Sequence, residues 1–156
     1  MINFINALIF VLVTLFDLYI AAILLRVLLQ FVRAPFHNPL CQFIVKITNP
    51  GFIVLRKVIP GFYGIDFAGV VFAIIVAVLE IILITFLKFN TLPTLTGCMI
   101  GCIFIIIGSF LSIYLWSIII MVICSFIAQT NPSAYNPLFE LTYIISEPVL
   151  KPIKKM

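Results

Sequence analysis

Three long apolar runs constrain the fold of this chain more than any other feature. They cover residues 4–32, 67–87 and 97–127, and each can cross a membrane, which takes about 20 consecutive apolar residues. Hydrophobic residues make up 65% of the 156 residues and charged residues only 9%, too few charges for the surface of a water-soluble protein. We therefore expect residues 1–156 to form a single all-α membrane domain with three spans. The first span is expected to be retained rather than cleaved as a signal peptide.

The segments that follow the first and third runs repeat one another. Corresponding residues lie 98 positions apart with no gap. The matched sets are Asn38-Pro39 with Asn136-Pro137, Thr48-Asn49-Pro50 with Ser146-Glu147-Pro148, and Arg56-Lys57 with Lys154-Lys155. The spans before them correspond at an offset of 95, where Tyr19 matches Tyr114 and residues 30–32 match residues 125–127. We therefore predict two parallel repeats, residues 4–66 and 97–156, with the second span, residues 67–87, between them.

Asn38 and Pro39 open an amphipathic helix. Asparagine is a good N-cap, and proline fits the first helical position because its missing N–H needs no partner there. Polar residues at positions 38, 42, 46 and 49 share one stripe of this helix. The opposite face carries Leu40, Phe43, Ile44 and Ile47. A helix of this length is too short to span a membrane, so we expect it to lie in the interface.

We expect this helix to break at Asn49-Pro50, because a proline inside a helix removes a hydrogen bond. A second short helix then runs from Gly51 to about Val58. The C-terminal copy carries its polar stripe at Asn136, Glu140, Tyr143 and Glu147. The predicted fold class is therefore an all-α membrane protein with three transmembrane helices and two broken amphipathic interfacial helices, arranged as two parallel repeats.

The block from Asn38 to Asp66 resembles the YggT family of small bacterial membrane proteins, which has plastid relatives. The family's hallmark is a repeated NP-x-hydrophobic-x-[TS]-x-P-basic block that ends in a Pro-Gly and a Gly-x-Asp turn. That turn is represented here by Pro60-Gly61 and Gly64-Ile65-Asp66. The resemblance implies a non-enzymatic scaffold or assembly factor of the inner membrane, involved in envelope organisation, cell division or membrane-complex assembly. From the residues alone, we expect Asp66 to cap the second span.

The basic residues predict the orientation, because cytoplasmic loops are enriched in Lys and Arg. If the N-terminus lies outside, the first loop and the C-terminal tail both lie in the cytoplasm. Seven of the eight basic residues in the loops and the tail then lie on the cytoplasmic side. The eight are Arg33, Lys46, Arg56, Lys57, Lys88, Lys151, Lys154 and Lys155. The pairs Arg56-Lys57 and Lys154-Lys155 either bind anionic lipid headgroups, at roughly 1 kcal/mol per residue, or only set the topology. Because these charges flank spans, no nucleic-acid partner is expected.

Three charged residues lie inside the spans: Asp17, Arg26 and Glu80. Asp17 and Arg26 are nine residues apart and so fall on opposite helix faces. We expect Arg26 to reach the headgroups by snorkelling. The carboxyls are either neutral groups hydrogen-bonded to a neighbouring helix or partner, or a proton or cation site. The second alternative describes a small oligomeric channel or transporter linked to osmotic or ion stress, although no span is broken by Gly or Pro as transport pathways often are.

Small residues on the third span predict close helix packing or self-association. Gly97, Gly101, Gly108 and Ser112 share one face. The four cysteines lie in apolar stretches and form no C-x-x-C pair, so we expect inert thiols and no metal or other cofactor. No nucleophile–base set and no phosphate-binding loop is visible, so no enzyme activity is expected.

Overall fold

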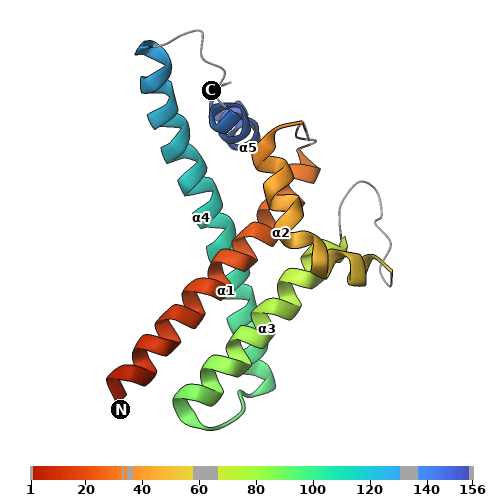
Figure 1. The fold of residues 1–156 in the computed structure, drawn as a ribbon, viewed down its shortest axis with the longest axis vertical. Coiled ribbons are helices and arrows are strands. Elements are labelled where there is room, and N and C mark those ends of the chain that lie inside the picture. Colours follow the sequence, from red (N-terminus) through yellow and green to blue (C-terminus); the bar gives the residue numbers. More distant parts are fainter. Residues whose placement is uncertain (1, 33, 35–36, 58–66, 131–136, 155–156) are drawn as a thin grey trace.

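The computed structural model describes residues 2–32, 34, 37–57, 67–130 and 137–154. They form five α-helices: α1 (Ile2–Phe31), α2 (Pro39–Arg56), α3 (Phe67–Phe89), α4 (Leu95–Thr130) and α5 (Pro137–Lys154). Figure 1 shows α1, α3 and α4 as the long elements of the fold. All three are long and apolar enough to cross a membrane, which confirms the predicted fold class and its three spans.

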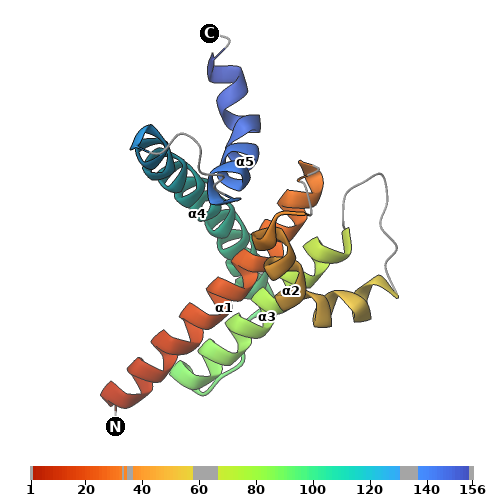
Figure 2. The same cartoon turned by 45° about the horizontal axis from the view of Figure 1, so that its top comes forward.

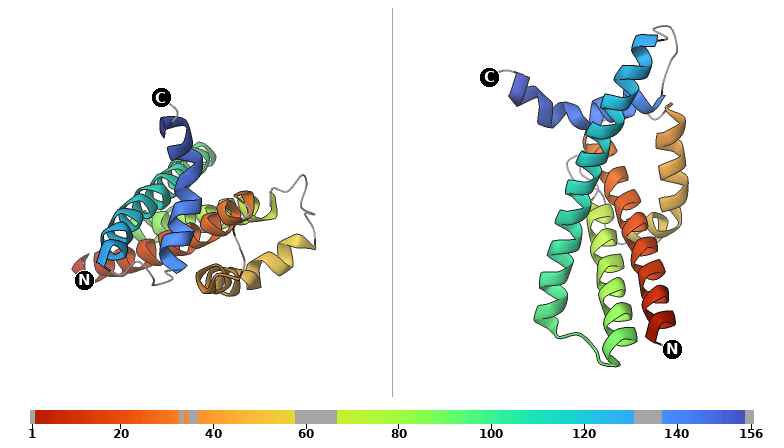
Figure 3. Two further views of the ribbon diagram at one scale, coloured as in Figure 1. Left: turned by 90° about the horizontal axis from the view of Figure 1, so that it is seen from above. Right: turned by 90° about the vertical axis from the view of Figure 1, so that its left-hand side faces the viewer.

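The three spans form the body of the fold. α3 runs antiparallel to both α1 and α4 and packs against each of them, and in the right-hand view of Figure 3 it lies between them. The core is made by apolar side chains of the C-terminal half of α1 together with Ala73 and Ala77 of α3, which are fully buried. Small residues let helices approach closely in a membrane. The outward side chains, such as Phe4 and Phe104, are exposed, as expected where lipid is the solvent.

The chain reverses direction between α3 and α4, and two local features define this turn: the residue that ends α3 and the residue that caps α4. Asn90 adopts a left-handed conformation, with φ at 54°, and its N–H donates to the Phe86 carbonyl at 2.9 Å. Asparagine is one of the few residues that ends a helix in this way. Thr94 then caps α4, because its hydroxyl oxygen accepts from the Gly97 N–H at 3.2 Å.

The two helices that begin at an Asn-Pro pair, α2 and α5, are called the NP helices below. Both lie at the end of the bundle opposite the N-terminus (Figure 1). α2 packs against α1 and α3, α5 packs against α4, and the two NP helices also touch each other. In the right-hand view of Figure 3, α5 crosses α4 rather than running along it.

The predicted break at Asn49-Pro50 is a bend in one helix. α2 continues through Pro50 to Arg56, and Figure 2 shows its second half turning away from the first. Proline bends a helix because it removes a hydrogen bond and its ring clashes with the preceding turn. The helix survives because it is held on both sides of the bend, where Thr48 and Phe52 are fully buried. In the second repeat, α5 likewise runs through Pro148 to Lys154.

Candidate functional site

Asn38 joins the two repeats. Its side-chain oxygen accepts from the Leu40 N–H at 3.0 Å and so caps α2, as the sequence predicts. Its amide nitrogen donates to the Pro137 carbonyl at 2.9 Å and to Glu140 Oε2 at 3.2 Å. One buried side chain therefore starts α2 and binds the first turn of α5. His37 lies at the edge of this contact, 3.9 Å from Glu140.

Arg26 is buried, which corrects the prediction that it snorkels to the headgroups. Only 6% of the residue is exposed. Its guanidinium donates to the Thr48 hydroxyl at 2.8 Å and to the Val45 carbonyl at 3.3 Å, and lies 4.0 Å from the centre of the Phe52 ring. The reason is that α2 folds back over the end of α1. The guanidinium of Arg26 therefore has polar partners within the protein and does not need to reach the lipid headgroups.

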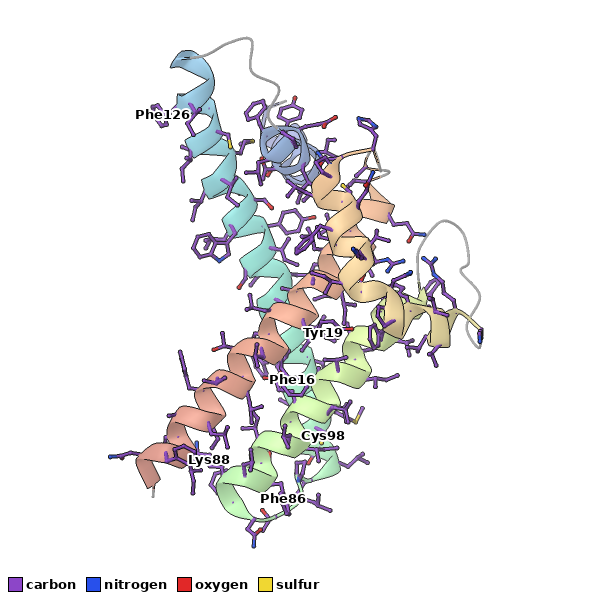
Figure 4. The ribbon with its side chains drawn as sticks, viewed as in Figure 1. Phe16, Tyr19, Phe86, Lys88, Cys98 and Phe126 are labelled. Atoms are coloured by element: carbon purple, nitrogen blue, oxygen red, sulfur yellow. The ribbon has the colours of Figure 1, made fainter. Side chains whose placement is uncertain are left out.

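A cluster of aromatic residues and glycines fixes α2 against α3. The Phe52 and Phe72 rings meet edge to face at 5.7 Å, and Tyr19 of α1 meets Phe72 in the same way at 5.9 Å. Figure 4 shows Tyr19 between α1 and α3. A Cβ on Gly51 would lie 2.0 Å from Phe72, and one on Gly69 would lie 2.4 Å from Val27. Sequence reasoning missed this cluster, although Gly51 beside the helix-bending Pro50 was an available signal.

The second repeat lacks the polar contact made by Arg26. Thr48 corresponds to Ser146 at the repeat spacing of 98, and Arg26 corresponds to Met121 at the spacing of 95 that relates the spans. Ser146 is fully buried, and its hydroxyl has no hydrogen-bond partner among the described residues. The two repeats therefore share a framework but differ in chemistry at this position.

The intramembrane carboxyls lie on two neighbouring helices, α1 and α3. Glu80 of α3 is 5% exposed, and its Oε2 has no hydrogen-bond partner within the described part of the chain. Asp17 of α1 is exposed. Because α1 and α3 pack against each other, the two residues that the sequence singles out lie on neighbouring helices.

A groove of about 870 Å³ lies beside the spans, walled by α1, α2, α4 and α5. Most of its wall is apolar. Its polar positions are Thr14, Asp17, Ser109, Ser112, Ser117 and Thr142.

The predicted small face of α4 is shared between α3 and this groove. A Cβ on Gly101 would contact Ile81 of α3 at 2.9 Å, whereas one on Gly108 would meet nothing within 4 Å. Gly97 lies in the first turn of α4 beside its cap, Thr94. Gly108 and Ser112 line the groove. Only the Gly101 end of this face therefore packs closely against another span.

The remaining site residues are placed as follows. Arg56 and Lys57 are exposed at the end of α2, and the Arg56 guanidinium lies 5.6 Å from the Phe52 ring centre. Asn49 is exposed, and Pro39 and Pro137 occupy the first positions of their helices. Lys154 is the last residue of α5. Six predicted residues lie outside the described residues: Pro60, Gly61, Gly64, Asp66, Asn136 and Lys155.

None of the four cysteines forms a disulfide, and three of them are buried: Cys41, Cys102 and Cys124. Burial raises the pKa of the Cys41 thiol above its ordinary value, and the negative charge of Glu140 raises it further. Across the described ranges, no group of three His, Cys, Asp or Glu residues is placed to hold a metal ion.

Comparison with known proteins identifies relatives along the whole chain. A sequence model of the CCB3/YggT family matches residues 5–87 and 100–156. An uncharacterized protein of Pseudomonas aeruginosa is 41% identical over 157 residues, covering 100% of this chain and 78% of that protein. An uncharacterized protein of Vibrio alginolyticus is 33% identical, covering 97% and 80%. The uncharacterized protein YggT of Escherichia coli K12 is 30% identical, covering 97% and 76%. No solved structure matches this chain.

Proposed function

This chain belongs to the CCB3/YggT family, and we propose that it is a non-enzymatic scaffold or assembly factor of the bacterial inner membrane. Its role would lie in envelope organisation, cell division or membrane-complex assembly. The observation that carries the proposal is the joining of the two NP helices by Asn38, whose amide binds Pro137 and Glu140. This contact makes one surface from two repeats that lie about a hundred residues apart in sequence.

The paired NP helices offer apolar side chains that the chain itself leaves uncovered. Phe43 and Val54 on α2 are 62% and 66% exposed, and Leu138 on α5 is also exposed. Short amphipathic helices of this kind lie in the membrane interface with their apolar side chains among lipids. Such a surface supports binding to lipid and to the membrane-embedded part of another protein.

We place the NP helices on the cytoplasmic side, with the N-terminus outside, because Lys and Arg gather beside them. Arg56 and Lys57 are exposed at the end of α2 and would bind anionic lipid headgroups, as would the Lys154-Lys155 pair. Changing all four residues to Gln should reduce the anionic lipid that copurifies with the protein, and added salt should have the same effect. Equal retention by the variant would leave topology as the only role of these residues.

One observation favours a second candidate, a small channel or transporter. Asp17 lines the groove, and Glu80 is buried on the neighbouring helix α3. Ionisable residues inside a membrane often mark ion pathways. The mostly apolar wall of the groove supports the scaffold instead, because a hydrated ion needs polar partners along its path.

A complementation experiment separates the two candidates. A bacterium lacking the gene is supplied with wild type, Asn38→Ala, or the double variant Asp17→Asn with Glu80→Gln. Growth under envelope stress and the assembly state of membrane complexes on native gels are then measured. The scaffold proposal expects Asn38→Ala to fail and the double variant to succeed. The opposite result, together with ion flux through the reconstituted wild type, would establish the channel.

A further inference from the structure

The groove lies where the two repeats face each other. Every wall residue on α1 corresponds to a wall residue on α4 at the spacing of 95, and both wall residues on α2 correspond to wall residues on α5 at the spacing of 98. Examples of such pairs are Thr14 with Ser109, Ala21 with Trp116, and Leu40 with Leu138. Whatever fills the groove therefore contacts both repeats.

The groove covers the half of the spans that lies next to the NP helices. Asp17 lies at the middle of α1, and the wall on this helix runs from Thr14 to Leu25. That distance is about 16 Å at 1.5 Å per residue, about half of a hydrocarbon core that is about 30 Å thick. On α4 the wall runs from Phe104 to Ile120 and so reaches slightly past the middle of the helix. The groove therefore has the depth of the lipid leaflet beside the NP helices.

The walls separate toward the NP helices, and α5 lies across the opening. Figure 1 shows α1 and α4 crossing and then diverging, with α5 between their ends. Leu138, Leu141 and Ile145 of α5 line the groove. An amphipathic helix lies in the interface with its apolar side among acyl chains. The space below α5 is therefore at the depth of the acyl chains.

Large apolar side chains of the wall are left uncovered by the chain itself. Leu18 is 64%, Phe104 73% and Trp116 61% exposed, and all three line the groove. Water does not fill apolar cavities, and an empty space forfeits the dispersion contacts of the atoms around it. A hydrocarbon occupant supplies those contacts.

We propose that the groove binds an acyl chain of a phospholipid from the leaflet beside the NP helices, as a fixed part of the fold. The acyl chain passes below α5 and ends near Asp17, and the headgroup stays at the level of the NP helices. Because it contacts α1, α4 and α5, the acyl chain stabilises the arrangement of the two repeats. The inference goes beyond the proposed scaffold function and does not depend on it.

Hydroxyl groups in the wall are compatible with an apolar occupant. The Thr14 hydroxyl donates to the Phe10 carbonyl at 2.8 Å, and the Thr142 hydroxyl donates to the Leu138 carbonyl at 2.8 Å. Both are thus satisfied within their own helices. The Asp17 carboxyl lies at the deep end of the groove, where the acyl chain stops.

A transmembrane helix, from a partner or from a second copy of this chain, suits the groove less well. A helix is rigid and about 10–12 Å wide, so it does not follow walls that diverge and then pass below α5. A flexible acyl chain bends to contact all of them.

The test uses Trp116, the only tryptophan of the chain, as a reporter in the groove. The full chain is reconstituted with phospholipid whose acyl chains carry bromine, which quenches tryptophan fluorescence on contact, and is then mixed with an excess of unbrominated lipid in mixed micelles. The control is Leu115→Trp in a Trp116→Phe background, because Leu115 is the adjacent residue, is 55% exposed and lies outside the groove. Fluorescence of Trp116 should recover about tenfold more slowly than that of the control, which corresponds to about 1.4 kcal/mol.

Two variants fill the groove from opposite walls. A Cβ built on Gly108 meets nothing within 4 Å, so Gly108→Leu places its side chain in the open space, and Ala21→Leu does the same from α1. Either variant should remove the slow recovery of Trp116. In native mass spectrometry, wild type should retain a bound phospholipid that both variants lack. Removing lipid should lower the melting temperature of wild type more than that of Gly108→Leu, and added phospholipid should restore it.

Three outcomes would overturn the inference. The first is recovery at Trp116 as fast as in the Leu115→Trp control. The second is equal retention of phospholipid by wild type and both groove-filling variants. The third is a Trp116 that brominated lipid does not quench at all, which would make the occupant a protein helix. None of these outcomes bears on the scaffold function, which Asn38→Ala tests separately.

Discussion

The Arg26 guanidinium of α1 donates a 2.8 Å hydrogen bond to the Thr48 hydroxyl of α2, and both residues are buried. The Thr48 hydroxyl in turn donates to the Ile44 carbonyl at 2.7 Å, so its oxygen is fixed in position to accept from Arg26. A buried charge is tolerated only where such partners surround it. This contact therefore determines where α2 lies on the first span.

The first prediction concerns the hydroxyl of Thr48. Thr48→Val keeps the shape of the side chain and removes the acceptor, so the free energy of unfolding should fall by about 1.5–3 kcal/mol, as for a hydrogen bond to a charged group. Thr48→Ser should keep most of the stability. Unfolding of the purified protein in detergent measures both, with Thr91→Val in the exposed turn as control. A Thr48→Val variant as stable as wild type would show that Arg26 does not depend on this bond.

Two glycines make a matched pair for the second prediction. Gly69→Ala places a methyl group 2.4 Å from Val27 and 2.9 Å from Phe52, and such overpacking should cost about 1–3 kcal/mol. Gly108→Ala meets nothing within 4 Å and should leave stability unchanged or raise it, because Ala favours helix over Gly. The same unfolding assay compares them. Equal stability of the two variants would contradict the close packing of α3 on α1.

The third prediction is the pH dependence of thiol labelling at Cys41. Burial raises the pKa of this thiol, and Glu140 raises it further, so less thiolate is present at any given pH and the labelling rate should rise only at higher pH. Thiolate is the reactive form. Glu140→Gln should move the labelling profile to lower pH while keeping a side-chain acceptor for Asn38.

The reference for Cys41 is a cysteine placed at the exposed Asn49 on the same helix. The Cys41 measurement requires the other three cysteines to be replaced by Ala. Coincident profiles for Cys41 and Asn49→Cys would disprove the effect of burial.

The fourth prediction concerns the orientation of the chain in the membrane. Cysteines placed at Lys57 and at Thr91 lie at opposite ends of α3 in sequence, and both positions are exposed. In intact cells, a membrane-impermeant thiol reagent should label Thr91→Cys and not Lys57→Cys, because the basic loop is placed in the cytoplasm. Labelling at Lys57→Cys from outside would reverse the assignment.

Sequence was sufficient for features that depend on neighbouring residues. Apolar length predicts the spans, and Asn38 with Pro39 predicts the start of α2, because capping involves only the next few residues. It was insufficient where distant segments meet. The burial of Arg26 depends on α2 folding back over α1, and the continuation of α2 through Pro50 depends on the packing of Phe52 against α3. The tight contacts at Gly51 and Gly69 depend on Phe72 and Val27, which no local pattern connects to them.

The last prediction concerns the two carboxyls. Glu80 is buried between the spans with one oxygen unpartnered among the described residues, and Asp17 lies at the groove. If the protein is a scaffold, both carboxyls act as hydrogen-bonding groups at helix contacts, where an unpaired charge would be costly. Asp17→Asn and Glu80→Gln keep the shape and the hydrogen-bonding capacity, so both should fold, insert and complement like wild type.

Asp17→Leu should insert normally but lose partner association, because it removes the polar group that faces the groove. Glu80→Leu should do the same or destabilise the bundle, and its unfolding free energy distinguishes the two effects. Complementation under envelope stress, with protein level in the membrane as control, is the measurement. If Asn and Gln already behave like Leu, the ionisable groups themselves are required, and the scaffold must be given up in favour of the channel.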